Sequence, residues 1–251
     1  MIICVVPAAG LGTRLGAKIP KLFVQLTPNL KVIDLLESTV GDLVDECCFV
    51  IRPDMVESLK KYSTNSKSTF VIQEEPRGMG DAVFKASRKI LQYETLLVVW
   101  GDQISLSKET LIRVIRKHAE NDVDCTIPLV KVQNPYVHYE INQFNQLEKL
   151  LQSREGDSLP SVGFSDIGVF ILKTNNIMTQ WESYLKQTPH LSNTTGEINF
   201  LPFLLFLSKN GKRQDFPIIE NAFEATGMNT RIELEKFKEV FQKKVSKDEF
   251  F

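Results

Sequence analysis

The sequence predicts an α/β fold built on a doubly wound sheet, and three observations lead to this class. Short, almost continuously apolar runs alternate with helical patterns through the first half of the chain. Such runs indicate strands buried on both faces, because a half-exposed strand would alternate apolar and polar residues. Gly, Pro, Asp or Asn flank the helical patterns, and this rhythm is typical of right-handed crossovers in a parallel sheet.

The first half supplies these elements in a regular order. Buried strands are predicted at residues 2–6, 47–51, 69–72 and 96–100. Helices are predicted at residues 32–43, 54–62, 81–91 and 110–118, and a further strand at 124–132. The helices are assigned because apolar residues recur there at spacings of three and four.

The second half differs in kind. Strand-like pieces at residues 139–141, 147–151 and 169–172 are separated by turn residues, which indicates antiparallel strands added at the carboxyl side of the sheet. Helices are predicted at residues 175–185, 197–207 and 230–247. No internal repeat or linker divides the chain. We therefore expect one domain over 1–251, with a main half at 1–132, a lobe at 133–229 and a C-terminal helix at 230–251.

Composition excludes several classes of protein. The chain has 251 residues, 43% of them hydrophobic, and a formal net charge of -1, which argues against general binding to nucleic acid or to an anionic membrane. No stretch approaches the roughly 20 apolar residues of a membrane span, so a cytoplasmic protein is expected. The three histidines lack metal-ligand spacing. The cysteines lie in or beside apolar runs and are expected as buried free thiols: Cys4, Cys47, Cys48 and Cys125.

Ligands of open parallel sheets bind beyond the carboxyl ends of the strands, so the loop after the first strand is a candidate site. Gly10 and Gly12 allow the backbone to approach a ligand closely, and unpaired N–H groups there would favour an anion. Arg14 and Lys21 add cationic groups. The P-loop pattern is absent, and Leu15 stands where the dinucleotide fingerprint needs a third glycine, which disfavours a dehydrogenase.

Five ordered segments carry a resemblance to a known family. They are PAAGLGTR at residues 7–14 with Pro20-Lys21, QEEPRGMGDAV at 73–83, Gly101-Asp102, Gly196-Glu197 and GMNTR at 227–231. Together they resemble the sugar-1-phosphate nucleotidylyltransferase (NDP-sugar pyrophosphorylase) superfamily, most nearly the N-terminal domain of N-acetylglucosamine-1-phosphate uridylyltransferases. The resemblance extends over most of the chain.

This resemblance implies a Rossmann-like mixed sheet of the nucleotide-diphospho-sugar transferase fold with an added substrate lobe. It implies a Mg²⁺-dependent enzyme that joins a nucleoside triphosphate, most often UTP, to a sugar 1-phosphate and releases pyrophosphate. Its catalytic cations would be Arg14 and Lys21, and its metal ligands Asp102 and Asn229. The nucleotide site would comprise Ala8, Ala9, Gly10, Leu11, Gly12, Thr13, Gln73, Gly78 and Gly101. The acceptor site would comprise Gln152, Asp166 and Glu197.

Some features depart from the family pattern and leave alternatives open. Met79 stands where the uridylyltransferases commonly carry Thr, and Asp166 where they carry Asn, so a different acceptor fits as well. Without hexapeptide repeats in the sequence, no acetyltransferase half is expected. The opening segment also resembles cytidylyltransferases of non-sugar alcohol phosphates, although their second and metal segments are not found. A non-catalytic nucleotide-binding protein is a further alternative. The oligomeric state, including a homo-oligomer, stays open.

Each segment also has a purely structural interpretation. Asp81 would favour the positive end of a helix dipole, and Glu197 would do the same at the start of the helix predicted at 197–207. Asp102 fits an ordinary turn after a strand, and Asn229 fits the N-cap of the last helix. Taken jointly, these interpretations leave the order and spacing of the segments unexplained.

Overall fold

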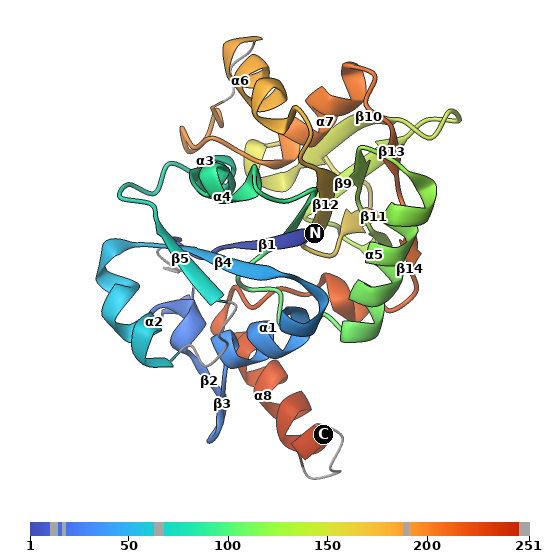
Figure 1. Cartoon of the computed structure of the whole chain (residues 1–251). Helices are drawn as coiled ribbons and strands as arrows, with labels where there is room; N and C mark the ends of the chain where they lie inside the picture. Colours follow the sequence, from blue (N-terminus) through green and yellow to red (C-terminus); the bar gives the residue numbers. More distant parts are fainter. Residues whose placement is uncertain (11–14, 17–18, 63–67, 188–190, 246–251) are drawn as a thin grey trace.

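A mixed sheet of seven strands runs through the centre of the computed structural model, which describes residues 1–10, 15–16, 19–62, 68–187 and 191–245 (Figure 1). The strand order is β13-β7-β12-β6-β1-β4-β5. The strands are β1 (Ile2–Pro7), β4 (Glu46–Ile51), β5 (Ser68–Ile72), β6 (Thr95–Val99), β7 (Cys125–Thr126), β12 (Val169–Lys173) and β13 (Gln214–Asp215). All neighbours pair in parallel except β12, which runs antiparallel to both β6 and β7.

The central strand β1 is buried on both faces, as its apolar run predicts. Ile3 and Val5 belong to one core cluster, whereas Cys4 and Val6 belong to the other, and all four side chains are fully buried. This alternation follows from the period of two along a strand. The four cysteines are free and buried, which confirms that prediction, and burial raises the pKa of Cys48 to about 12.

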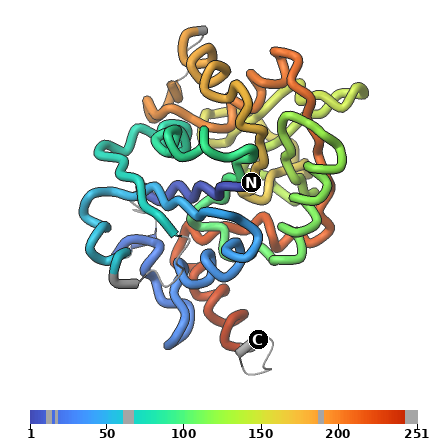
Figure 2. Tube along the Cα trace, viewed as in Figure 1, coloured from blue at the N-terminus to red at the C-terminus, as the bar shows by residue number. Residues whose placement is uncertain are grey.

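Helices cover both faces of the sheet. The cluster that contains Cys4 is closed by α1 (Val32–Val40), α2 (Val56–Tyr62), α5 (Lys108–Asn121) and α8 (Arg231–Val245). The cluster that contains Ile3 is closed by α3 (Met79–Lys85), α4 (Ser87–Ile90), α6 (Ile177–Gln187) and α7 (Leu201–Lys209). Figure 2 shows β1 at the centre of the trace and the last helix at its lower edge. The doubly wound arrangement predicted from the sequence is thereby confirmed.

Among the predicted elements whose bounds differ from those observed, three can be explained by particular residues. The strand predicted at 124–132 is two strands, β7 and β8 (Leu129–Gln133), because Pro128 between them has no N–H for a sheet bond. The helix predicted at 81–91 is interrupted at Ala86, whose N–H bonds to Val83, three residues back. The helix predicted to begin at Glu197 begins instead at Leu201, with Pro202 in its first turn. Glu197 therefore does not lie at a helix terminus.

The second half builds a lobe beside the sheet from short strands. Two strands form an antiparallel pair, β9 (Val137–Ile141) and β10 (Leu147–Gln152). Three strands form a small sheet in the order β11 (Val162–Asp166), β8 and β14 (Ile218–Ile219).

The remaining elements are short. The strands β2 (Gln25–Thr27) and β3 (Leu30–Lys31) pair with each other. The 3₁₀ turns are η2 (Lys21–Phe23), η3 (Gly41–Leu43), η4 (Pro53–Met55), η5 (Ser153–Glu155) and η6 (Ala222–Ala225).

Candidate active site

A cavity of about 390 Å³ lies beyond the carboxyl ends of β1 and β6, between the sheet and the lobe. This is the position at which open parallel sheets bind ligands. It brings together most of the residues that the sequence motifs select. The predicted site residues that line it are Ala8, Ala9, Gly10, Lys21, Gln73, Gly78, Gly101, Asp102, Glu197 and Asn229.

The loop after β1 is held from the neighbouring strand. The N–H of Ala8 donates to the carbonyl of Val50 at 2.8 Å, which continues the parallel ladder past the end of β1. The guanidinium of Arg52 donates to the carbonyl of Gly10 at 2.9 Å and pairs with Asp54. Among the described residues, none has an atom within 4 Å of a Cβ built at Gly10, so their packing does not require glycine there.

The remaining residues predicted in this loop, Leu11, Gly12, Thr13 and Arg14, lie outside the described residues. Their assignment as nucleotide-binding and catalytic residues stays a prediction. Arg52, which the sequence analysis did not select, is the described cation beside this loop. Its side chain is 16% exposed and binds Asp54 and the carbonyl of Gly10. These contacts suit a residue that positions the loop.

Lys21, Asp102 and Asn229 meet at one point although 208 residues separate the first from the last. The ammonium of Lys21 donates to Asn229 Oδ1 at 2.9 Å and to Asp102 Oδ2 at 3.3 Å. Asp102 follows β6, and Lys21 opens η2. The two side chains of the ion pair keep exposures of 21% and 22%, so the point is partly shielded but open to the cavity. A cation is thus held between a carboxylate and an amide oxygen.

The backbone fixes this meeting point. The N–H of Met228 donates to the carbonyl of Asp102 at 2.9 Å, which joins the segment before α8 to the loop after β6. A Cβ at Gly227 would lie 3.0 Å from Asn229 Nδ2 and 3.4 Å from Asp102 Cγ, so glycine lets the two segments approach. Gly101 does the same beside β1, since a Cβ there would lie 3.0 Å from the carbonyl of Pro7.

Asn229 does not cap the last helix with its side chain. Thr230 and Glu233 form the cap instead: the Glu233 carboxylate accepts from the N–H groups of Asn229 at 2.8 Å and Thr230 at 2.7 Å, and Glu233 N–H donates to Thr230 Oγ1 at 3.3 Å. This is a capping box. The amide side chain of Asn229 is thereby left to the cavity, so the structural interpretation of that residue is wrong.

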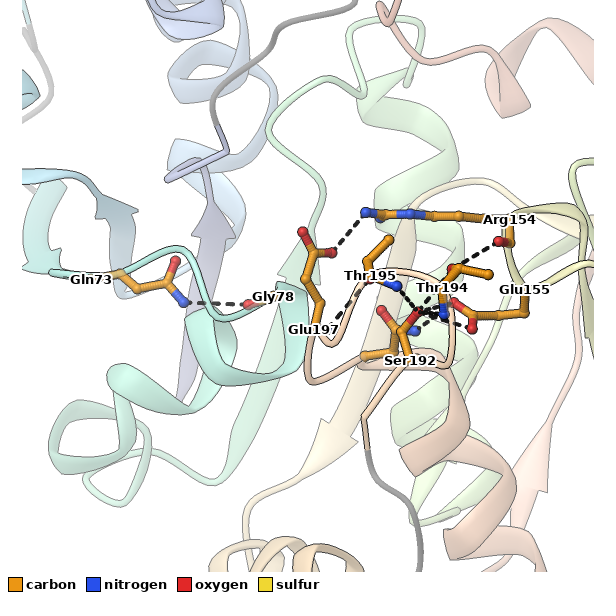
Figure 3. A network of polar contacts seen from close by, with 9 residues as sticks. Gln73, Gly78, Arg154, Glu155, Ser192, Thr194, Thr195 and Glu197 are labelled. Carbon is orange, nitrogen blue, oxygen red and sulfur yellow. Dashed lines mark hydrogen bonds and ion pairs between the residues drawn. The ribbon is translucent and has the colours of Figure 1, made fainter.

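The segment at 73–83 forms the next wall. Gln73 is 2% exposed, and its amide donates to Asp81 at 2.7 Å. The same amide donates to the carbonyl of Gly78 at 3.3 Å (Figure 3). Gly78 has a φ of +113°, which favours glycine, and a Cβ there would lie 2.7 Å from backbone atoms of Ile198. Glycine at this position therefore allows the wall to contact the loop that carries Glu197.

The structure separates the three predicted acceptor residues. Glu197 lines the cavity, whereas Gln152 and Asp166 are not among its lining residues. Gln152 ends β10, and its N–H donates to Asp157 at 2.8 Å. Asp166 accepts from the hydroxyl of Tyr139 at 2.9 Å and from the N–H of Gly168, and burial raises its pKa. Gln152 and Asp166 thus lie outside the lining of this cavity, and their assignment to the acceptor site stays a prediction.

Arg154 lines the cavity two residues beyond Gln152, and the sequence analysis missed it. Its guanidinium donates to Glu197 at 2.9 Å. No local pattern marks this arginine, because it belongs to a 3₁₀ turn whose position depends on contacts with the loop at 191–199. The described charges around the cavity are therefore two cations, Lys21 and Arg154, each paired with a carboxylate.

The donor set at the meeting point suits a hard cation. Asp102 and Asn229 offer oxygen atoms to one shared position, and Mg²⁺ prefers oxygen ligands and binds to few protein groups when phosphates supply the others. Among the described residues, no group of three or more His, Cys, Asp and Glu side chains could hold a metal by itself. Mg²⁺ bound at this point would take its further ligands from water or from a bound phosphate.

Comparisons with known proteins agree with this architecture. A family model described as "MobA-like NTP transferase domain" matches residues 4–162. The Bifunctional protein GlmU of Fervidobacterium nodosum is 25% identical over 244 residues, which cover 95% of this chain and 50% of that protein. The Bifunctional protein GlmU of Alkaliphilus metalliredigens is 24% identical over 97% of this chain and 52% of its own length. The chain thus spans about half the length of the curated relatives it matches.

A solved structure supports the fold independently. The crystal structure of HddC from Yersinia pseudotuberculosis superimposes with a TM-score of 0.68 and 23% identity, covering 96% of this chain and all of that one. The nucleotide-diphospho-sugar transferase fold expected from the motifs is thereby confirmed. In the part of the chain that the structure describes, every helix is too short or too polar to span a membrane.

Proposed function

Because the chain belongs to the MobA-like NTP transferase domain family, we propose that it is a nucleotidyltransferase that joins a nucleoside triphosphate, UTP by preference, to a sugar 1-phosphate. One observation carries this proposal: Lys21, Asp102 and Asn229 converge in the same cavity as the loop after β1, Gly78 and Glu197. The preference for UTP rests on the sequence resemblance.

The proposed reaction is an in-line displacement. A phosphate oxygen of the acceptor forms a bond to the α-phosphorus of the triphosphate, the bond from that phosphorus to the bridging oxygen breaks, and pyrophosphate leaves with the electron pair. An acceptor phosphate is already ionised near pH 7, so no general base is needed. His118 is remote from this chemistry: its ring is bonded to Thr126 and it does not line the cavity.

The obstacle to this reaction is the repulsion between two anions, so the protein must position and neutralise them. We assign Asp102 and Asn229 as the residues that would hold Mg²⁺, which when bound supplies positive charge at the α-phosphate. Lys21 would then turn from these oxygens to the phosphates, where a flexible ammonium acts as a point charge. Arg14 would hold the β- and γ-phosphates, by resemblance, as pyrophosphate departs.

The nucleotide and the acceptor would occupy opposite walls of the cavity. We assign the base to the backbone of the loop after β1 and to Gln73 and Gly78, which form one wall. The acceptor is assigned to the wall that carries Glu197. The contact between Gly78 and the Glu197 loop keeps the two walls in a fixed relation, which an in-line attack requires.

The test is a matrix of the four common triphosphates against a panel of phosphate monoesters, with released pyrophosphate as the readout. We expect turnover with UTP and a sugar 1-phosphate in the presence of Mg²⁺. Turnover confined to CTP and an alcohol phosphate would contradict the sugar assignment. Nucleotide binding without turnover for any acceptor would indicate a binding protein and would overturn the proposal.

A pair of variants tests the proposed metal ligand. Asp102→Ala should abolish turnover while the far-UV circular dichroism spectrum stays unchanged, because the substitution removes a charge from the cavity and no core contact. Asp42→Asn is the control, since it removes a carboxylate from an exposed ion pair with Lys108. Near-normal turnover in Asp102→Ala would reject the assignment.

A further inference from the structure

The acceptor wall of the cavity carries a charge pair of Glu197, which the motif at 196–197 selects, and Arg154, which no motif selects. Arg154 Nη2 lies 2.9 Å from Glu197 Oε2, and the two side chains are 39% and 32% exposed. Figure 3 shows the contact between the two side chains. Both residues line the cavity, as do Lys21, Asp102 and Asn229. The pair is thus accessible to a ligand that fills the cavity.

The backbone of η5, which carries Arg154, is fixed by hydrogen bonds to the loop at 191–199. The carbonyl of Arg154 accepts from the hydroxyl of Thr194 at 3.0 Å. The next residue, Glu155, accepts from the hydroxyl of Ser192 at 2.7 and 2.9 Å and from the amide of Asn199 at 3.1 Å (Figure 3). These bonds join η5 to the loop at 191–199. The backbone that carries the guanidinium is therefore fixed relative to the loop that carries its partner.

Glu197 is held from the opposite side by the nucleotide wall. The N–H of Ile198 donates to the carbonyl of Arg77 at 2.7 Å, and the N–H of Gly80 donates to the carbonyl of Ile198 at 2.8 Å. A Cβ at Gly78 would lie 2.8 Å from Glu197 Cβ. The backbone on both sides of the charge pair is therefore fixed by hydrogen bonds. Such preorganised polar groups are what a specificity site needs.

The chemistry of the pair indicates what it binds. A guanidinium carries five N–H donors and a carboxylate about four acceptor sites, and the bond between Arg154 and Glu197 uses one of each. The pair thus presents donors and acceptors side by side, which matches adjacent hydroxyl groups, since each hydroxyl both donates and accepts. Its net charge is zero, so it offers no excess positive charge to a second anionic group, which would also meet the charge of Glu197.

We propose that Arg154 is a specificity-determining residue that, together with Glu197, binds the hydroxyl groups of an acceptor whose phosphate is its only anionic group. This inference rests on the proposed nucleotidyl transfer and names the substrate class of that same site: a neutral polyhydroxylated phosphate monoester. In this proposal the charge pair of Arg154 and Glu197 recognises the acceptor, and Gln152 and Asp166 do not contact it.

The test compares acceptors with and without a second charge. The wild-type enzyme should use glucose 1-phosphate or N-acetylglucosamine 1-phosphate with a kcat/KM at least about tenfold above that for glucuronic acid 1-phosphate, because the carboxylate of the latter is not compensated. Glu197→Gln removes the repelling charge and should narrow that ratio. A wild-type preference for glucuronic acid 1-phosphate would overturn the proposal.

Variants at Arg154 separate binding of the acceptor from the rest of the reaction. Arg154→Met should raise the KM for the neutral acceptor by about tenfold or more, because it removes charge-assisted hydrogen bonds, and leave the KM for UTP within about twofold. Arg154→Lys should recover part of the loss. Lys149→Met is the matched control, since it breaks an exposed ion pair with Glu140 elsewhere in the lobe.

The outcomes distinguish this inference from the function on which it rests. No turnover by the wild type with any acceptor would overturn the nucleotidyl transfer itself, and this inference with it. Turnover by the wild type with an unchanged acceptor KM in Arg154→Met would overturn the role of Arg154 alone. An equal rise in the KM for UTP and for the acceptor would show a structural effect on the whole cavity and would also overturn it.

Discussion

Replacing Lys21 with Met tests whether its ammonium stands where a divalent cation would bind. Nζ lies 2.9 Å from Asn229 Oδ1 and 3.3 Å from Asp102 Oδ2. A metal held by the same two oxygens must displace the ammonium, because two cations cannot share one position. We therefore expect Lys21→Met to bind Mn²⁺ more tightly than the wild type when no nucleotide is present.

The structure sets the size of this effect. Unit charges 3.3 Å apart attract by roughly 5 kcal/mol at an effective dielectric constant of about 20. Both side chains stay about one-fifth exposed, so screening and lost hydration reduce the net value to about 1–2 kcal/mol. Since about 1.4 kcal/mol corresponds to a factor of ten, the affinity for Mn²⁺ should rise roughly tenfold. Turnover should fall about a hundredfold, because a cation that faces the phosphates contributes on the order of 3 kcal/mol to the barrier.

The assay is a titration of the protein with Mn²⁺ at low ionic strength, with free Mn²⁺ measured by electron paramagnetic resonance. Lys21→Arg keeps the charge and should not bind Mn²⁺ more tightly than the wild type. Asp102→Asn should weaken Mn²⁺ binding both in the wild type and in Lys21→Met. The reasoning is refuted if Lys21→Met has the same melting temperature as the wild type and binds Mn²⁺ no more tightly. The ammonium and the metal would then not compete for the same position.

Three further predictions concern stability. Gly78→Ala should cost about 2–4 kcal/mol in urea unfolding, because φ is +113° and the Cβ would lie 2.7 Å from a neighbouring backbone; Gly211→Ala, with φ +74° and open space, should cost only about 1 kcal/mol, and equal losses would contradict the steric argument. Burial lowers the pKa of His118 to about 4, below the 6.5 of an unfolded histidine, so the free energy of unfolding should fall by up to about 3 kcal/mol as the pH drops from about 6.5 to 4. A pH titration of His118→Gln should lack that part of the slope, and an unchanged profile would count against it. Burial acts to raise the pKa of Glu46, but hydrogen bonds from Lys89 and two hydroxyl groups outweigh burial and lower it. Glu46→Gln should therefore lower the free energy of unfolding by about 1–2 kcal/mol at pH 7 and by less at pH 3. A decrease of the same size at both pH values would refute this.

The nucleotide half could be predicted because its determinants are local. A strand buried on both faces is a continuous apolar run, and β1 and β4 match the predicted runs to within one residue at either end. The motifs there place Gly101 and Asp102 in the loop after β6, and the topology of a parallel sheet brings strand ends to one edge. The position of Asp102 at this edge therefore followed from the sheet, whereas Lys21, which opens η2 well beyond the end of β1, was assigned to the site through the motif.

Short elements could not be predicted because they depend on their neighbours. The strands β13 and β14 have two residues each, too few for a period of two to appear in the sequence. They exist because β7 and β8 offer them edges: Gln214 pairs with Cys125, and Ile218 pairs with Leu129. Such pairing is a property of the assembled sheet, which no single segment encodes.

The acceptor wall shows the same limit where it matters for function. The pairing of β10 with β9 shifts register between Leu147 and Lys149, and a slip of one residue changes which side chains face a cavity. The chain then turns through η5, so the position of Arg154 is decided by hydrogen bonds that Glu155 accepts from a loop about 40 residues away. On the proposed assignment, the residues that bind the triphosphate lie in continuous motifs, whereas Arg154 lies where long-range contacts set the register. Acceptor specificity is therefore best sought in the charge pair of Arg154 and Glu197, of which the motifs mark only Glu197.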